Sequence, residues 1–161
     1  MKAVVADTSP INYLLLIGYV DLLRQLYSRI VIPEAVFKEL TDAGAPPLVE
    51  AWMRTERDWI EIRSAPSGIF CLVDGEPALD AGEVAAIQLA LAEHDSLLLI
   101  DEAAGRTVAS RLGIANTGTL GVLVAGAREG FVDLEESLNR LRTTNFRISE
   151  SLINKLLGKV D

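Results

Sequence analysis

Two aspartates follow segments that have the pattern of buried strands. Asp7 follows the apolar run AVVA at residues 3–6, and Asp101 follows the nearly all-apolar run SLLLI at 96–100. Such runs indicate strands of a parallel sheet, and sites in parallel sheets lie beyond the carboxyl ends of the strands. Each aspartate alone also fits an ordinary turn. Their shared position at two strand ends favours a functional site.

Two glutamates are further candidates for the same site. Glu39 lies near the apolar face of the amphipathic segment 34–44, and Glu83 stands at the start of 82–94, the strongest helical pattern in the chain. Each also has a simpler interpretation. Glu39 fits a solvated helix face, and Glu83 fits the acidic first turn that a helix dipole favours.

Several carboxylates in one pocket repel one another, so they need a cation or protonation to persist there. Oxygen ligands without histidine or cysteine select Mg²⁺ or Mn²⁺. Such ions commonly serve phosphoryl chemistry, in which they generate a hydroxide and stabilise the leaving oxygen. These residue types therefore predict a metal-dependent reaction at a phosphate ester.

The composition narrows the classes of protein that remain. The 161 residues suit one domain with a sizeable core, and half of them are hydrophobic. Cys71 is the only cysteine and His94 the only histidine. An internal disulfide, a cysteine zinc site and a multi-histidine metal site are therefore excluded.

The charge and the apolar runs bear on partners and location. A net charge of -8 argues against a broad basic surface for nucleic acid, although a local basic rim around an acidic site remains compatible with it. The apolar runs are short and interrupted by charges, so no membrane span is expected. The start lacks the features of a signal peptide, so a cytoplasmic protein is expected.

Strand-like and helix-like segments alternate along the chain. Helices that separate strands imply right-handed crossovers and a mostly parallel sheet of four to five strands, covered on both faces. Residues 66–80 are predicted to be a connection in which 69–73 pairs or packs. The predicted strands are 3–6, 29–33, 59–65, 96–100 and 114–118, and the predicted helices are 10–17, 20–27, 34–44, 47–56, 82–94, 102–113, 119–130, 133–143 and 149–157.

Five stretches together resemble a PIN domain, the metal-dependent ribonuclease fold of VapC-type toxins, and most closely a prokaryotic PIN-related family of unassigned function. They are VVADTSPINYL, IPEAVFKEL, LDAGEVAAIQLA, LLLIDEAAGRTVASRLG and NTGTLGVLVAGAREG, which span most of residues 3–130, and FRISESLINKLL near the end is also similar. The resemblance implies a single three-layer α/β/α PIN-like domain over 1–161. It also implies that an acidic quartet binds the metal and activates water: Asp7, Glu39, Glu83 and Asp101.

The match to that quartet has identifiable departures. Glu83 stands where many PIN toxins carry an aspartate, so its longer side chain must reach differently. Glu34 lies close to Glu39 and competes with it for the same role. Two spare acids, Glu102 and Asp80, could replace a member of the quartet.

Polar residues near these acids are candidates for substrate contacts. The resemblance gives Thr8 and Ser9 the role of orienting the first acid. Arg106, together with Arg111, is a candidate for RNA phosphates, although Arg106 also fits a local pair with Glu102. Two threonines after a strand end are candidates for a phosphate or a metal-bound water, and the first of them also fits a helix cap: Thr117 and Thr119.

The resemblance implies a Mg²⁺- or Mn²⁺-dependent endoribonuclease that acts on single-stranded or structured RNA, as the toxin half of a toxin–antitoxin pair. A small antitoxin and a second copy of the chain are the implied protein partners. One alternative is a PIN-fold binding module without activity. Another is an aspartate-dependent phosphotransfer enzyme, which Ser9 disfavours because such enzymes carry an acid two residues after the first one.

Overall fold

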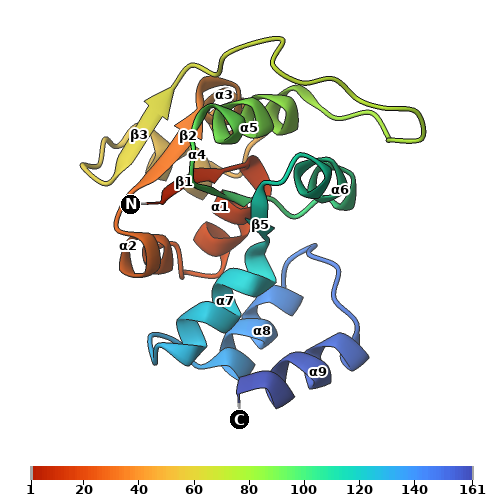
Figure 1. The fold of residues 1–161 in the computed structure, drawn as a ribbon. Coiled ribbons are helices and arrows are strands. Elements are labelled where there is room, and N and C mark those ends of the chain that lie inside the picture. Colours follow the sequence, from red (N-terminus) through yellow and green to blue (C-terminus); the bar gives the residue numbers. More distant parts are fainter. Residues whose placement is uncertain (1, 161) are drawn as a thin grey trace.

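The computed structural model describes residues 2–160, in which five strands form one all-parallel sheet and nine helices flank it (Figure 1). The strand order is β3-β2-β1-β4-β5, so β1 is central and β2 and β4 are its neighbours. This confirms the predicted α/β fold, and the sheet is fully parallel. The strands are β1 (Ala3–Ala6), β2 (Ile30–Pro33), β3 (Ile60–Arg63), β4 (Ser96–Leu99) and β5 (Ala115–Thr117).

The central strands are apolar on both faces because both faces of the sheet are covered. In β1, Val4 and Ala6 face one hydrophobic core, and Val5 faces the other. In β4, Leu99 faces the same core as Val4, and Leu98 faces the same core as Val5. Successive side chains of a strand point to opposite faces, so a continuous apolar run serves two cores at once. This is the physical reason why the runs at 3–6 and 96–100 predict central strands.

Helices cover both faces of the sheet, and two further helices lie outside them. Residues from α5 and α6 belong to one core, and residues from the other helices belong to the other core. Helices α8 and α9 pack on α7 and on each other, and Figure 1 shows them on the side of α7 away from the sheet. The helices are α1 (Thr8–Leu16), α2 (Asp21–Tyr27), α3 (Glu34–Leu40), α4 (Pro47–Arg54), α5 (Ala81–Ala92), α6 (Ala103–Arg111), α7 (Thr119–Arg128), α8 (Leu134–Arg142) and α9 (Glu150–Val160).

None of the helices described within residues 2–160 combines the length and the apolar character needed to cross a bilayer.

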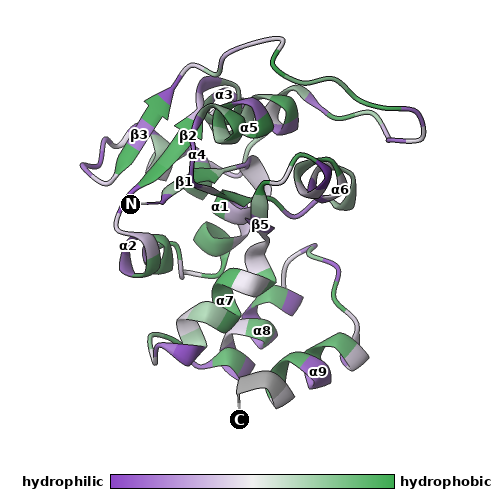
Figure 2. Cartoon of the chain, in the orientation of Figure 1, coloured by the Kyte–Doolittle hydropathy of each residue, from purple (hydrophilic) through white to green (hydrophobic). Residues whose placement is uncertain are grey.

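The connection 64–80 departs in part from the sequence prediction. It contains no strand, and only Phe70 of the run 69–73 packs against a core. The other apolar side chains of the run are exposed, and Figure 2 shows hydrophobic stretches along the projecting loop between β3 and α5. Arg111 is used to hold this loop, since its guanidinium pairs with Glu76 at 2.9 Å. Arg111 is therefore engaged within the chain, while its contact with RNA stays a prediction.

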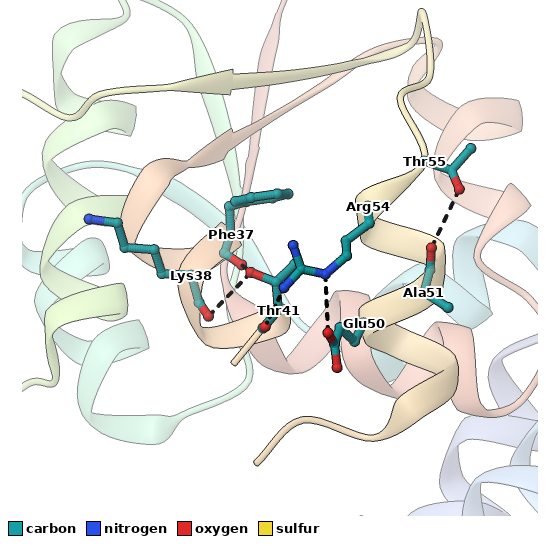
Figure 3. A network of polar contacts seen from close by, with 7 residues as sticks. All are labelled: Phe37, Lys38, Thr41, Glu50, Ala51, Arg54 and Thr55. Carbon is teal, nitrogen blue, oxygen red and sulfur yellow. Dashed lines mark hydrogen bonds and ion pairs between the residues drawn. The ribbon is translucent and has the colours of Figure 1, made fainter. Parts of the chain in front are cut away.

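Helix α3 is held at its carboxyl end by a polar network, which matters because this helix carries Glu39 (Figure 3). Arg54 of α4 donates to the Thr41 carbonyl at 3.1 Å and to the Glu50 carboxylate at 3.1 Å. The Thr41 hydroxyl donates to the Phe37 carbonyl at 2.8 Å. Carbonyls at a helix end lack partners within the helix, so these bonds stabilise the end of α3.

Candidate functional site

Asp7 and Asp101 lie at the same edge of the sheet. Strands β1 and β4 pair in parallel with Ala6 opposite Leu99, and the Asp7 amide donates to the Leu99 carbonyl at 2.9 Å. Asp7 follows β1 directly, and Asp101 follows β4 after one residue. The topology therefore brings two residues that are 94 positions apart in the chain to neighbouring places at the carboxyl edge.

A cavity of about 370 Å³ at this edge is lined by five acidic residues. Thr8 and Ser9 also line it, at the start of α1. It includes three predicted quartet members and both spare acids, and it does not include Asp101. This cavity is called the carboxylate pocket below, and its acids are Asp7, Glu39, Asp80, Glu83 and Glu102.

Asp7 is the most strongly perturbed acid of the pocket. It is only 3% exposed, and as the N-cap residue of α1 it does not accept a capping hydrogen bond. Burial raises the pKa of Asp7 to about 7, the Thr8 amide lowers it, and the charges of Asp80, Glu83 and Glu39 raise it further. A carboxyl with this pKa holds a proton for part of the time at neutral pH, unless a cation replaces that proton.

Glu83 has both a capping role and an unused oxygen. Its amide donates to Asp80 Oδ1 at 2.8 Å, and its own Oε1 accepts from the Asp80 amide at 2.9 Å, which is a capping box at the start of α5. The simpler interpretation of Glu83 is therefore correct for one oxygen. Its other oxygen, Oε2, is buried and has no hydrogen-bond partner among the described residues. Burial also raises the pKa of Glu83.

Glu39 reaches the pocket from α3, across the start of α5. The Thr8 hydroxyl donates to Glu39 Oε2, so Thr8 orients Glu39. A Cβ atom on Gly82 would lie 2.6 Å from Glu39 Oε1, so the carboxylate occupies space that only a glycine leaves open. Glu34 lines a different cavity. Of these two glutamates, Glu39 lines the carboxylate pocket and Glu34 does not.

Asp101 lies in a second cavity of about 400 Å³ that adjoins the first through two shared lining residues, Ser9 and Glu102. Its Oδ1 accepts from the Thr119 amide at 2.6 Å, and its Oδ2 accepts from the Thr119 hydroxyl at 2.7 Å. Burial raises the pKa of Asp101, and the two bonds from Thr119 lower it. The structure thus places three predicted quartet members in one pocket and the fourth next to it.

The remaining predicted substrate residues lie in different surroundings. Thr119 is fully buried and holds Asp101, so it positions an acid and does not face a substrate. Thr117 lines neither cavity and packs against Gly121, since a Cβ there would lie 1.8 Å from its hydroxyl; it does not cap α7. Arg106 forms no ion pair with Glu102 in the part of the chain that the structure describes, and its charge lowers the pKa of Asp101.

Four residues of the second cavity were missed by the sequence reasoning. They come from α1 and from the connection between α8 and α9, far apart in the chain. The stretch that holds three of them, FRISES and the residues before it, contributed to the family resemblance but carried no recognisable chemistry. They are Tyr13, Asn145, Phe146 and Arg147.

The carboxylate pocket fits a divalent cation by its chemistry, although its side chains are not arranged as a formed site. The charged side chains that line it are all carboxylates, and the buried Glu83 Oε2, which has no partner in the part of the chain that the structure describes, could be satisfied by a cation. Within residues 2–160, no group of three or more acidic, histidine or cysteine side chains is positioned to hold one ion. Binding would therefore require some of these side chains to change rotamer.

A protein-family model described as a PIN domain matches residues 3–161. The chain belongs to the PIN-domain family. PIN domains are generally nucleases, they generally use divalent metal ions, and their fold is consistent with binding of nucleic acid. The family that matches is one of unassigned function. No curated protein matches the chain. The family match confirms the resemblance to a PIN domain.

Proposed function

We propose that this protein is a Mg²⁺- or Mn²⁺-dependent endoribonuclease whose active site is the carboxylate pocket together with Asp101. The observation that supports this most is the buried Glu83 Oε2, which has no hydrogen-bond partner within residues 2–160 and lines a pocket of five acids together with Asp7. Buried carboxylate oxygens with a purely structural role are rarely left without a partner. A cation at the pocket would satisfy that oxygen and offset the repulsion.

In this proposal Asp7, Glu39, Glu83 and Asp101 hold the ion. Bound there, the ion would supply a hydroxide near neutral pH and offset charge on the leaving oxygen. The chain's own residues orient these acids. Thr8 holds Glu39, the Asp80 amide holds Glu83, and Thr119 holds Asp101. Three of the four acids therefore accept a hydrogen bond that orients them.

The biological role in the proposal is that of the toxin of a prokaryotic toxin–antitoxin pair in the cytoplasm. Single-stranded or structured RNA would be the substrate, and a small antitoxin and a second copy would be protein partners. Exposed large apolar side chains are compatible with such interfaces. They lie on the loop 64–80, on α4, on β3 and after α7: Ile69, Leu72, Val73, Leu48, Ile62 and Phe131.

The second candidate function is a PIN-fold binding module without nuclease activity. One observation favours it: among the described residues the acids are not arranged to hold one ion. In addition, both oxygens of Asp101 already accept hydrogen bonds from Thr119. The phosphotransfer alternative gains nothing from the structure, since Ser9 at the start of α1 is not an acid.

RNA cleavage distinguishes the two candidates. The purified protein, free of any partner, is incubated with a mixed RNA pool in Mg²⁺ or Mn²⁺ and, separately, in EDTA. The wild type should cut only with the metal. Asp7→Asn and Asp101→Asn should each lower the rate about 100-fold or more, because loss of a ligand exceeds the effect of losing an outer hydrogen-bond partner. Equal cutting by all three proteins would indicate a contaminating nuclease and favour the binding module.

A further inference from the structure

The second cavity differs in chemistry from the carboxylate pocket that it adjoins. Besides acids, it is lined by two aromatic rings, a side-chain amide and a guanidinium. Ser9 and Glu102 line both cavities, so the two cavities adjoin at the carboxyl edge. A molecule with a phosphate group at the carboxylate pocket would therefore have the second cavity directly beside it.

The wall of this cavity is built by a segment that comes from the far end of the chain. Residues 143–149 connect α8 and α9, and Figure 1 shows this connection rising from the helical layer toward α6 and the end of the sheet. Tyr13 of α1 anchors it. The Tyr13 hydroxyl donates to Asn145 Oδ1 at 2.6 Å, and the Tyr13 and Phe146 rings meet edge to face with centroids 4.9 Å apart. The wall is thus held in a defined position.

The wall also presents two side chains, Arg147 and Phe146, to the cavity. Arg147 is exposed and forms no ion pair or hydrogen bond among the described residues, although Asp101 and Glu102 line the same cavity. Phe146 is only partly buried, so part of its ring faces the cavity. An aromatic face stacks on any nucleobase, and a guanidinium binds phosphate with two parallel hydrogen bonds.

We propose that this second cavity holds the nucleotide next to the phosphodiester that is cut, with its base against Phe146 and Tyr13 and its further phosphate on Arg147. The proposal rests on the proposed nuclease function. The proposal accounts for how RNA is attracted to a protein with a net charge of -8, whose carboxylate pocket repels RNA. The cavity offers the attraction for base and phosphate that the pocket lacks. Because any base can stack on an aromatic ring, the proposal predicts little preference among the four bases.

Nucleotide binding tests the cavity without cleavage. Adenosine 5′-monophosphate and ribose 5-phosphate are titrated in Mg²⁺ by calorimetry, and they differ only by the base. The wild type should bind the nucleotide about tenfold more tightly, which is the size of effect that stacking on an aromatic side chain has. Phe146→Leu should remove this preference, and Arg147→Gln should weaken both ligands. Arg128→Gln is the control, since Arg128 is exposed at the far end of α7 from Thr119.

Equal affinity of the wild type for the two ligands would overturn the stacking proposal, as would unchanged binding by both variants. If Phe146→Leu is not folded at the temperature of the titration, Arg147→Gln still decides the outcome. An exposed arginine without a partner among the described residues contributes little to folding.

RNA cleavage separates a failure of this proposal from a failure of the proposed function. Arg147→Gln should raise the KM for a short RNA about tenfold, with kcat changed much less, because the residue binds substrate away from the reacting atoms. Cleavage by the wild type with an unchanged KM in Arg147→Gln would overturn the second cavity and leave the nuclease standing. If no protein cleaves RNA, but adenosine 5′-monophosphate still binds more tightly than ribose 5-phosphate and this difference depends on Phe146, the nuclease is overturned and a nucleotide site remains.

Discussion

Asp7 and Asp101 have equivalent places at the ends of β1 and β4, yet their surroundings differ. Asp7 is 3% exposed, accepts no capping bond from its own helix, and has three other acids near it. Asp101 has a hydrogen bond from Thr119 on each of its oxygens. The strand end brings a carboxylate to the site, but its hydrogen-bond partners decide how costly its charge is. The two aspartates should therefore respond in opposite ways to substitution.

The largest expected effect is a loss of stability as Asp7 ionises. Its pKa is about 7 in the folded chain against 3.8 as the ordinary value, so the unfolded state releases this proton at lower pH. Without metal, the free energy of unfolding should therefore fall as pH rises from about 4 to about 8, by on the order of 4 kcal/mol from this group. Urea unfolding in EDTA at several pH values measures it.

Asp7→Asn provides the matched control for that titration. It keeps the shape and removes the charge, so it should resemble the wild type at pH 4 and be more stable than it at pH 8. The difference between the two proteins isolates Asp7 from other titrating groups. If Asp7→Asn is less stable than the wild type at pH 8, burial does not penalise this carboxylate and the contrast with Asp101 is lost.

Substitution of Asp101 should have the opposite sign. Asp101→Ala leaves the amide and the fully buried hydroxyl of Thr119 without their acceptor. The free energy of unfolding should fall by about 3 kcal/mol, since an unpaired buried polar group costs about 1–3 kcal/mol. Asp101→Asn should restore most of this loss, because its side-chain oxygen still accepts from the amide. Equal melting of Asp101→Ala and the wild type would show that these bonds do not matter.

A smaller effect is expected at Gly82, which leaves room for Glu39. A Cβ there would lie 2.6 Å from Glu39 Oε1, so Gly82→Ala should displace the flexible carboxylate and weaken Mn²⁺ binding several-fold. The free energy of unfolding should change by less than about 1 kcal/mol, because alanine favours the helix. Gly44→Ala is the control, since a Cβ there meets no atom within 4 Å. Equal Mn²⁺ affinity of both variants would remove Glu39 from the ligand set.

The strands and helices were predictable because their signals are local. The apolar runs at 3–6 and 96–100 identify central strands, and the small and apolar residues of 82–94 identify α5, which the structure places at Ala81–Ala92. The capping role of Glu83 follows from its position one turn after Asp80. The loop 64–80 was only partly predictable, because its apolar run is exposed and carries no pattern that separates it from a strand.

The site was predictable only as far as it depends on strand ends. That Thr119 binds both oxygens of Asp101 depends on a contact between residues 18 positions apart, which no local pattern encodes. The wall at Asn145, Phe146 and Arg147 depends on how α8 and α9 fold back onto α7, and its anchor to Tyr13 spans 132 positions. Tertiary contacts of this kind decide which polar residues face a cavity, and single-sequence patterns do not report them.

Binding of Mn²⁺ to the purified protein at pH 8 tests the central claim most directly. The loss of the free Mn²⁺ signal in electron paramagnetic resonance gives the affinity without any assay of RNA. The wild type should bind Mn²⁺ at submillimolar concentration, and Asp7→Asn should bind it at least about tenfold more weakly. Glu135→Gln should match the wild type, because it removes one charge from an exposed position on α8. Equal binding by the wild type and Asp7→Asn, or none by the wild type at millimolar Mn²⁺, would contradict a metal site in the carboxylate pocket.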